Sequence, residues 1–196
     1  MVSNDRYITL QSCILTLWTA AVGALGTFSN ALIFSLGLFD REESGALAFG
    51  LVFAFAALSG TLFGGTITDF TLDRLGADPS SNRIMVALLP RISVGVGISV
   101  CFYLSTYFAT SSAITFLTCM FFGFFFFFAI QSPIMRCLLN SVEEDYRPNA
   151  LGMNAVLKHL LGDIPGTIIF GLIKDSLTPA CIIDQKGEFL RILVLV

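Results

Sequence analysis

Three long stretches of this chain carry no Asp, Glu, Lys or Arg, and they constrain its fold more than any other feature. Residues 7–39, 44–68 and 92–135 contain 33, 25 and 44 consecutive positions without such a charge. A helix needs about 20 apolar residues to cross the hydrocarbon core of a bilayer. The three stretches therefore hold one, one and two membrane helices, and they indicate an integral membrane protein.

The composition excludes several other classes of protein. Only 13% of the 196 residues are charged, about half the share usual in a soluble domain. The formal charge of −3 gives no basic surface for nucleic acid. The five cysteines form no C-x-x-C pair and His159 is the only histidine, so we expect no metal site and no cofactor. Without a nucleophile motif or a phosphate-binding loop, an enzyme is not expected either.

The positions of charged and helix-breaking residues predict an all-α, polytopic helix bundle that forms a single domain over residues 1–196. Five complete membrane helices and a sixth stub are expected at residues 9–38, 46–66, 84–108, 113–139, 148–173 and 189–196. The charged segment 69–83 is expected to be a loop. Six basic residues fall on the side of the N-terminus and four on the other side, which favours a cytoplasmic N-terminus.

The first predicted helix carries a continuous stripe of small or polar side chains. Its members lie on one helical face because they follow each other at spacings of three or four: Ser12, Thr16, Thr19, Gly23, Gly26 and Asn30. One interpretation is close packing against another helix. The other is a wall of an aqueous or substrate cavity, lined by Thr16, Thr19 and Asn30. In the second helix, Gly60-x-x-x-Gly64 is typical of close helix packing.

The fourth predicted helix contains phenylalanine at seven of the eight positions 121–128, with Gly123 as the exception. We expect this block to contact lipid and to fill the core. Pro133 lacks an amide hydrogen, so we expect it to kink the helix and expose a hydrogen-bonding group. The nearby Gln131 is therefore a further candidate for lining a cavity.

The fifth predicted helix places three ionisable groups inside the membrane. Lys158 and Asp163 lie ten and fifteen residues beyond Pro148, at depths of roughly 15 and 23 Å. Such charges are costly in lipid and should face protein or water. His159 and Asp163 are four residues apart and can touch, whereas Lys158 needs Asn154, another helix or water as its partner. Pro165 should bend or open the helix just after Asp163.

Three roles remain open for Lys158, His159 and Asp163. They can form a buried structural network, a proton-responsive or gating element, or a direct contact to substrate. Histidine titrates near neutral pH, so the His159–Asp163 pair is the natural candidate for sensing protons. Charged groups beside an interrupted membrane helix are typical of transporter sites.

Two segments resemble the major facilitator superfamily of transporters. Gly64-Gly65-Thr-Ile-Thr-Asp69, with Arg74-Leu-Gly76 after it, resembles the Gly-x-x-x-Asp-(Arg)-x-Gly loop motif, although Phe70 replaces the basic residue. The segment 147–175, with His-Leu-Leu-Gly-Asp at 159–163, resembles the eleventh helix of Spinster-like transporters. Its later part, to Cys181, is also similar to organic-anion transporters of the same superfamily.

The Spinster resemblance implies that the chain is the C-terminal half of such a transporter, with helices seven to eleven and the start of twelve. It implies that the first helix here lines the central cavity and that Asp69, in the loop motif with Gly65 and Arg74, helps to latch cytoplasmic helix ends. The substrate would be a lipid or another amphipathic solute, in some members coupled to protons.

The partners implied are the bilayer, the substrate and a missing N-terminal six-helix half, without which this chain should be inactive. An organic-anion carrier and a non-transporting scaffold fragment remain as alternatives. The protein should be multi-pass, in the plasma membrane or a lysosomal or endosomal membrane.

Overall fold

The computed structural model describes residues 2–35, 37–39, 41–75, 81–108 and 112–177. Every regular element within these ranges is a helix, so the predicted all-α bundle is confirmed. The elements are α1 (Val2–Ser35), α2 (Glu42–Leu75), α3 (Ser81–Phe108), α4 (Ala113–Ala129), α5 (Gln131–Asn140), η1 (Glu144–Tyr146), α6 (Arg147–Lys158), η2 (His159–Asp163) and α7 (Ile164–Leu177). The stub predicted at 189–196 lies outside the described residues.

Several helical segments are long and apolar enough to cross a membrane. Among the described residues, four such segments are Glu42–Leu75, Ala87–Thr106, Ala113–Asn140 and Glu144–Ile173, and a shorter apolar segment spans Ser12–Phe28. These segments agree with a multi-pass membrane protein.

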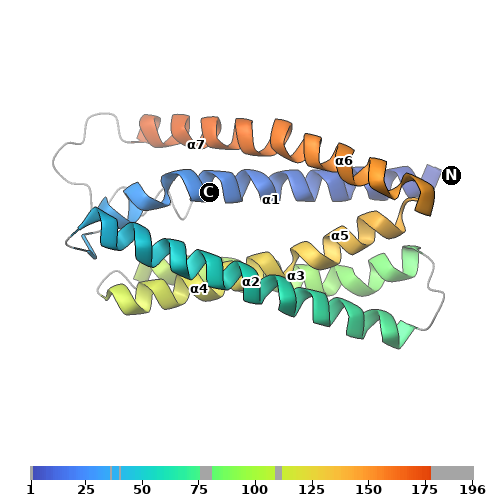
Figure 1. Cartoon of the computed structure of the whole chain (residues 1–196), viewed down its shortest axis with the longest axis horizontal. Coiled ribbons are helices and arrows are strands. Elements are labelled where there is room, and N and C mark those ends of the chain that lie inside the picture. The colour runs from blue at the N-terminus through green and yellow to red at the C-terminus, as the bar shows by residue number, and fades with distance from the viewer. Residues whose placement is uncertain (1, 36, 40, 76–80, 109–111, 178–196) are drawn as a thin grey trace.

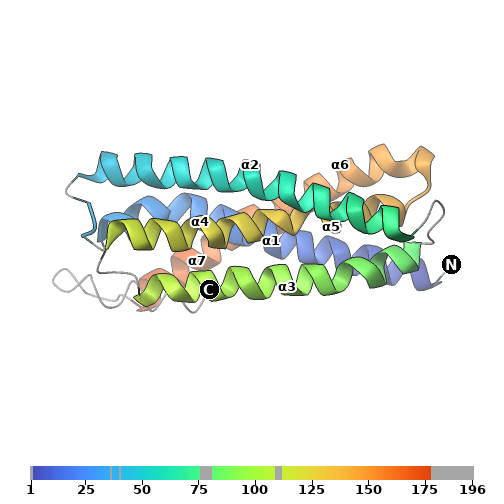
Figure 2. The same cartoon turned by 90° about the horizontal axis from the view of Figure 1, so that it is seen from below.

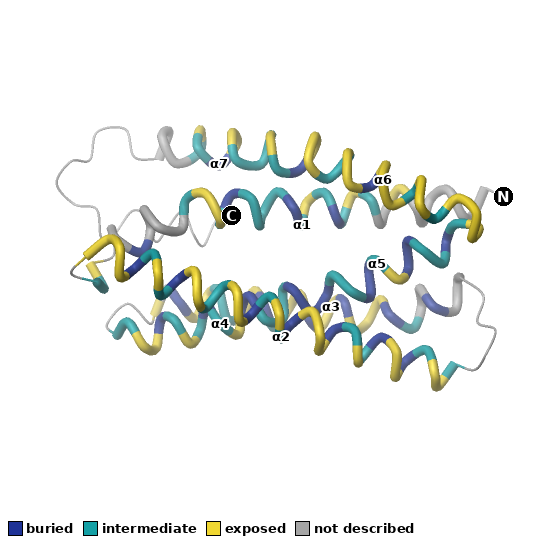
Figure 3. The backbone as a smooth tube through the Cα atoms, viewed as in Figure 1, coloured by how far each residue is buried: buried dark blue, intermediate teal, exposed yellow. Residues whose placement is uncertain are grey.

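The long helices run side by side along the long axis of the molecule (Figures 1 and 2). In one group, α4 packs against both α2 and α3. In the other, α1 packs against η2 and α7, while α5 contacts α1, α2 and α3 and so joins the groups. Buried positions recur on the helix faces that meet, and exposed positions lie on the outer faces (Figure 3).

The second helix is longer than the sequence predicted. It begins at Glu42 and continues to Leu75, so residues 69–75 of the expected loop, Asp69 and Arg74 among them, are helical. Glu42 lies in the first turn and Arg74 in the last, where their charges oppose the helix dipole and stabilise the ends. The Arg74 guanidinium also lies 4.2 Å from the centre of the Phe70 ring. The charges that suggested a loop therefore extend the helix.

The first helix ends earlier than predicted, at Ser35 instead of residue 38. Gly37 has a φ of 64°, a left-handed conformation that glycine adopts without steric cost and that commonly follows a helix end. The turn to α2 is thus determined by a glycine.

Glycines bring α2 and α4 into backbone contact. A Cβ atom at Gly60 would overlap the carbonyl oxygen of Phe125, and one at Gly64 would overlap that of Ala129. The two glycines and the two carbonyls are each four residues apart, so one turn of α2 lies directly against one turn of α4. The packing role predicted for Gly60 and Gly64 is confirmed.

Aromatic rings fill the core around this contact. Phe124 is 1% exposed, and its ring meets those of Phe49 and Tyr103 edge-on at 5.7 and 5.5 Å. Edge-to-face pairs of this kind stabilise beyond simple burial, by about 0.5–1.5 kcal/mol each. Phe122, on another side of α4, is exposed. The phenylalanine block thus serves both the core and the outer surface, as expected.

Replacing Gly64 with Ala should destabilise the bundle. The added methyl group has no room against the Ala129 carbonyl, and overpacking of this kind costs about 1–3 kcal/mol. Gly50→Ala is the matched control, because Gly50 lies on the same helix with open space around its Cα. Thermal unfolding in detergent should show a lower midpoint for Gly64→Ala only. Equal midpoints would mean that the α2–α4 contact is not close-packed.

Candidate functional site

The most irregular part of the described helices lies between α6 and α7. Residues His159–Asp163 form the π-helix η2, in which the Ile164 amide donates to the carbonyl of His159, five residues earlier. Two residues after η2 comes Pro165, which has no amide hydrogen to give to the carbonyl of Leu161. The wider π turn therefore forms where the α-helical pattern cannot continue, and such turns are frequent at functional sites.

His159 and Asp163 form a short contact across this turn. Nδ1 of His159 lies 2.5 Å from Oδ2 of Asp163, so the contact expected from their spacing is present. The side chains are 69% and 34% exposed, respectively. The pair thus lies on an outer face of the described bundle although its helix is long enough to span a membrane. Because charge in lipid is costly, this face is suited to water or to other protein.

Helix α1 packs against the π turn that carries His159 and Asp163. A Cβ atom at Gly162 would lie 2.7 Å from the Thr16 carbonyl oxygen, and one at Gly166 would lie 2.7 Å from the Ala20 side chain. On α1, a Cβ at Gly23 would lie 3.0 Å from an Asp163 carboxylate oxygen. The absence of side chains at these three glycines lets the π turn rest directly on α1 and fixes where Asp163 lies.

The stripe on α1 divides between packing and open positions. Thr19 is buried and its Cβ lies close to Gly162, while the hydroxyls of Thr16 and Thr19 donate to carbonyls of their own helix. Gly26 has open space around it. The middle of the stripe is therefore a packing surface here. The side chain of Asn30 lies outside the part of the chain that the structure describes.

Asn154 and Lys158 lie on the same helix as the pair but are not brought into contact with it. Asn154 is buried with no hydrogen-bond partner for Oδ1 among the described residues. Lys158 is half-buried, and no hydrogen bond or ion pair to it is found within the described ranges. The structure therefore shows no polar partner for the Asn154 Oδ1 or for Lys158 among the described residues.

The remaining candidates gather at a second place, between α2 and α5. A hollow of about 380 Å³ is lined by Gly65 and Asp69 from α2 and by Gln131 and Arg136 from α5, among others. Arg74 does not line it, because its guanidinium lies over Phe70. Gln131 therefore lies near Gly65 and Asp69 of the loop motif, and not near the His159–Asp163 pair.

Sequence reasoning missed Arg136 as a lining residue of this hollow. Its carboxylate neighbour in the hollow, Asp69, comes from a helix far away in the chain, so no local pattern indicates the pairing. The sequence does contain one usable signal. Arg136 lies about one helical turn after Pro133, and the break in the helix there changes the direction of the side chains that follow.

That break separates α4 from α5 at Ile130, as Pro133 predicted. The Nε1–H of Trp18 donates to the carbonyl of Phe127 at 3.1 Å, and the indole stacks on the Phe127 ring. A backbone acceptor of α4 is thus used by α1, which links the two groups of helices.

Comparisons with known proteins agree with this geometry. The chain is 29% identical over 135 residues to an Arabidopsis thaliana protein named probable sphingolipid transporter spinster homolog 2, a match that covers 69% of this chain. The chain thus resembles Spinster transporters over about two thirds of its own length. It is also 29% identical over 137 residues to spinster homolog 1 of the same plant. The chain spans about a quarter of the length of these relatives, 26% in each case.

A second group of transporters also resembles part of this chain. The Organic Anion Transporter Polypeptide (OATP) family matches residues 110–186. A Mus musculus protein named solute carrier organic anion transporter family member 4C1 is 44% identical over 73 residues, which is 37% of this chain and 10% of that protein. Both groups are named as transporters, which agrees with the major facilitator resemblance.

Replacing Gly162 with Ala should separate the π turn from α1. The new methyl group would press on the Thr16 carbonyl, and we expect a loss of about 1–3 kcal/mol in the free energy of unfolding. Gly152→Ala on α6 is the control, since its surroundings are open. Unfolding in mixed micelles would measure both. A neutral Gly162→Ala variant would contradict the close α1–η2 contact.

Proposed function

We propose that the chain forms helices seven to eleven of a Spinster-like secondary transporter that moves a lipid or another amphipathic organic solute. We further propose that His159 and Asp163 make transport responsive to protons. The observation that carries this proposal is a hydrogen-bonded His–Asp pair on the outer face of an interrupted, membrane-length helix.

Protonation of His159 would change the charge of the pair. With a neutral imidazole and an ionised Asp163 the pair carries −1, and with an imidazolium it carries zero. A net charge is expensive away from water, whereas a neutral ion pair is less so. The protonated state should therefore favour a conformation in which this face is covered by protein, and the deprotonated state one in which water reaches it.

The π turn offers a place for the helix to move. A π segment has one residue more than the α-helical hydrogen-bond pattern accommodates, and here its first and last residues are His159 and Asp163. Transporters of this kind work by moving one half against the other around a site near the middle of the bilayer. A change in the charge of the pair could thus be converted into a change in the angle between α6 and α7.

The relatives indicate the class of solute. The Arabidopsis proteins are named as probable sphingolipid transporters, and we extend an amphipathic lipid substrate from them to this chain. An organic-anion carrier is the second candidate, because the OATP match covers the part that contains the pair and a mouse organic anion transporter is 44% identical over 73 residues. Uptake by proteoliposomes of the full-length transporter, with a lysolipid or sphingoid base and a bulky organic anion offered in parallel, would decide between them.

The pair is tested by His159→Gln and Asp163→Asn in the full-length protein. Both should lower transport, and the rate should lose its dependence on external pH between about 5.5 and 7.5, where histidine normally titrates. Asp73→Asn is the control, because Asp73 is exposed near the end of α2, away from the pair. Initial rates in proteoliposomes across this range would be the measurement. A wild-type pH profile in His159→Gln would refute proton sensing by this pair.

The π turn is tested by Pro165→Ala. An alanine supplies the missing amide, so residues 159–166 can return to the α-helical pattern. We expect the variant to be more stable, by about 1–3 kcal/mol, and to transport more slowly because the helix bends less readily. Unfolding midpoints and initial rates on the same preparation would be compared. A more stable variant with unchanged transport would show that the turn has no part in the cycle.

A further inference from the structure

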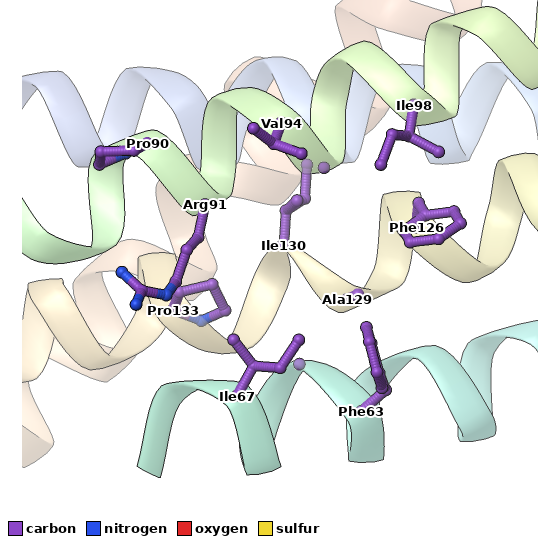
Figure 4. Close-up of a pocket in the computed structure, with 12 residues that line it drawn as sticks. Phe63, Ile67, Pro90, Arg91, Val94, Ile98, Phe126, Ala129, Ile130 and Pro133 are labelled. Carbon is purple, nitrogen blue, oxygen red and sulfur yellow. The ribbon is translucent and has the colours of Figure 1, made fainter. Parts of the chain in front are cut away.

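An apolar groove lies between α2, α3 and the α4–α5 break (Figure 4). Its volume is about 490 Å³, within the range of roughly 300–1,000 Å³ typical of small-molecule sites. It shares no lining residue with the hollow that contains Asp69 and Gln131. It is also lined by no residue of α6, η2 or α7, so it is separate from the His159–Asp163 pair.

The groove exists because of the residues that also pack the helices. Gly64 on α2 and Gly95 on α3 line it without contributing a side chain, and Ile130 at the helix break lies between them (Figure 4). Phe63 and Val94 form parts of its rim and are 41% and 60% exposed. The groove therefore opens to the outer surface of the described bundle.

Arg91 is the one charged side chain among the described residues that line the groove. It is exposed, and no carboxylate lines the groove with it. Nη1 of Arg91 donates to the Ala87 carbonyl at 2.5 Å, which holds the guanidinium toward the start of the membrane segment Ala87–Thr106. Arg91 directly precedes the charge-free stretch 92–135, so its charge lies at the end of the apolar part of α3, from which a long arginine side chain can reach the headgroups.

We propose that this groove binds an anionic phospholipid of the surrounding bilayer. Its phosphate would accept hydrogen bonds from Arg91, which has guanidinium donors beyond the one that contacts Ala87. Its acyl chain would run along α3 past Val94 and Ile98, which lies seven residues or about 10 Å from Arg91. The Phe126 ring lines this end of the groove beside Ile98 (Figure 4).

Charge complementarity selects this occupant. A single cation at the polar end of an otherwise apolar groove matches an amphiphile with one anionic head, and it disfavours a purely apolar protein helix. With the N-terminus in the cytoplasm, as the basic residues favour, the Arg91 end faces the cytoplasmic leaflet, which carries the anionic lipids. The proposal does not depend on what the protein transports.

The test is lipid-dependent thermal unfolding of the purified full chain in mild detergent. Phosphatidylglycerol, phosphatidylcholine and inorganic phosphate are titrated separately, and each apparent affinity is obtained from the rise in unfolding midpoint. We expect phosphatidylglycerol to bind about fivefold more tightly than phosphatidylcholine. Arg91→Gln should abolish that preference. Arg41→Gln, which removes an exposed charge at the turn before α2, should keep it.

A second variant tests the acyl-chain half of the site. Val94→Phe fills the groove at an exposed position and leaves Arg91 in place, so it should weaken both phospholipids by a similar factor without lowering the midpoint in their absence. Equal lipid preference in wild type and Arg91→Gln would overturn the headgroup assignment. Unchanged affinity in Val94→Phe, or the same stabilisation by inorganic phosphate alone, would overturn the groove as the lipid seat.

Discussion

Backbone contact at glycine is the interaction on which this structure depends. In a bilayer the lipid chains are as apolar as the side chains, so burial alone gives helices little reason to associate. Close packing must supply the attraction, and it does so where Gly60 and Gly64 let α2 lie on the carbonyls of α4. Gly162 and Gly166 do the same for α1 and the π turn. The two groups of helices are each organised around one such contact.

Two prolines then determine where the irregular features lie. Pro133 ends the regular pattern of α4, and in the same region the Phe127 carbonyl accepts a hydrogen bond from Trp18. Pro165 has the same effect on the last membrane segment, where the π turn carries His159 and Asp163. Each break lies next to a glycine contact: Gly64 faces Ala129 beside Ile130, and Gly162 lies inside η2. In both places a tight contact packs the neighbouring turn against another helix.

Much of the fold could be predicted because long charge-free stretches report directly on the thickness of the bilayer. The ends of α2 could not be predicted in this way. Glu42 and Arg74 lie outside the predicted helix 46–66, but their charges stabilise the ends of the longer helix in which they lie. The His159–Asp163 contact followed from the spacing of four residues, which keeps two side chains on one face even through a π turn. Pro165 indicated an irregular turn near Asp163, but not that this turn would rest on α1 at Gly162. The meeting of Asp69 and Arg136 in one hollow depends likewise on how α2 aligns with α5, which is a tertiary fact.

The outer surface of the bundle differs from side to side, and this difference bears on how the chain is oriented among its neighbours. The exposed face of η2 carries a carboxylate and an imidazole in the middle of a spanning segment. The exposed face of α2 and α3 is apolar, with Arg91 near the end of its segment and a groove beyond it. The face of α2 and α3 is compatible with lipid, because an arginine near the membrane boundary reaches the headgroups. The face of η2 is not, because the shorter side chains of His159 and Asp163 cannot reach them. Under the proposed function, the face of η2 meets water and the other half of a transporter, and the face of α2 and α3 meets the bilayer. The His159–Asp163 pair and the proposed lipid groove then belong to different groups of helices, which are joined by the α1–α4 contact at Trp18.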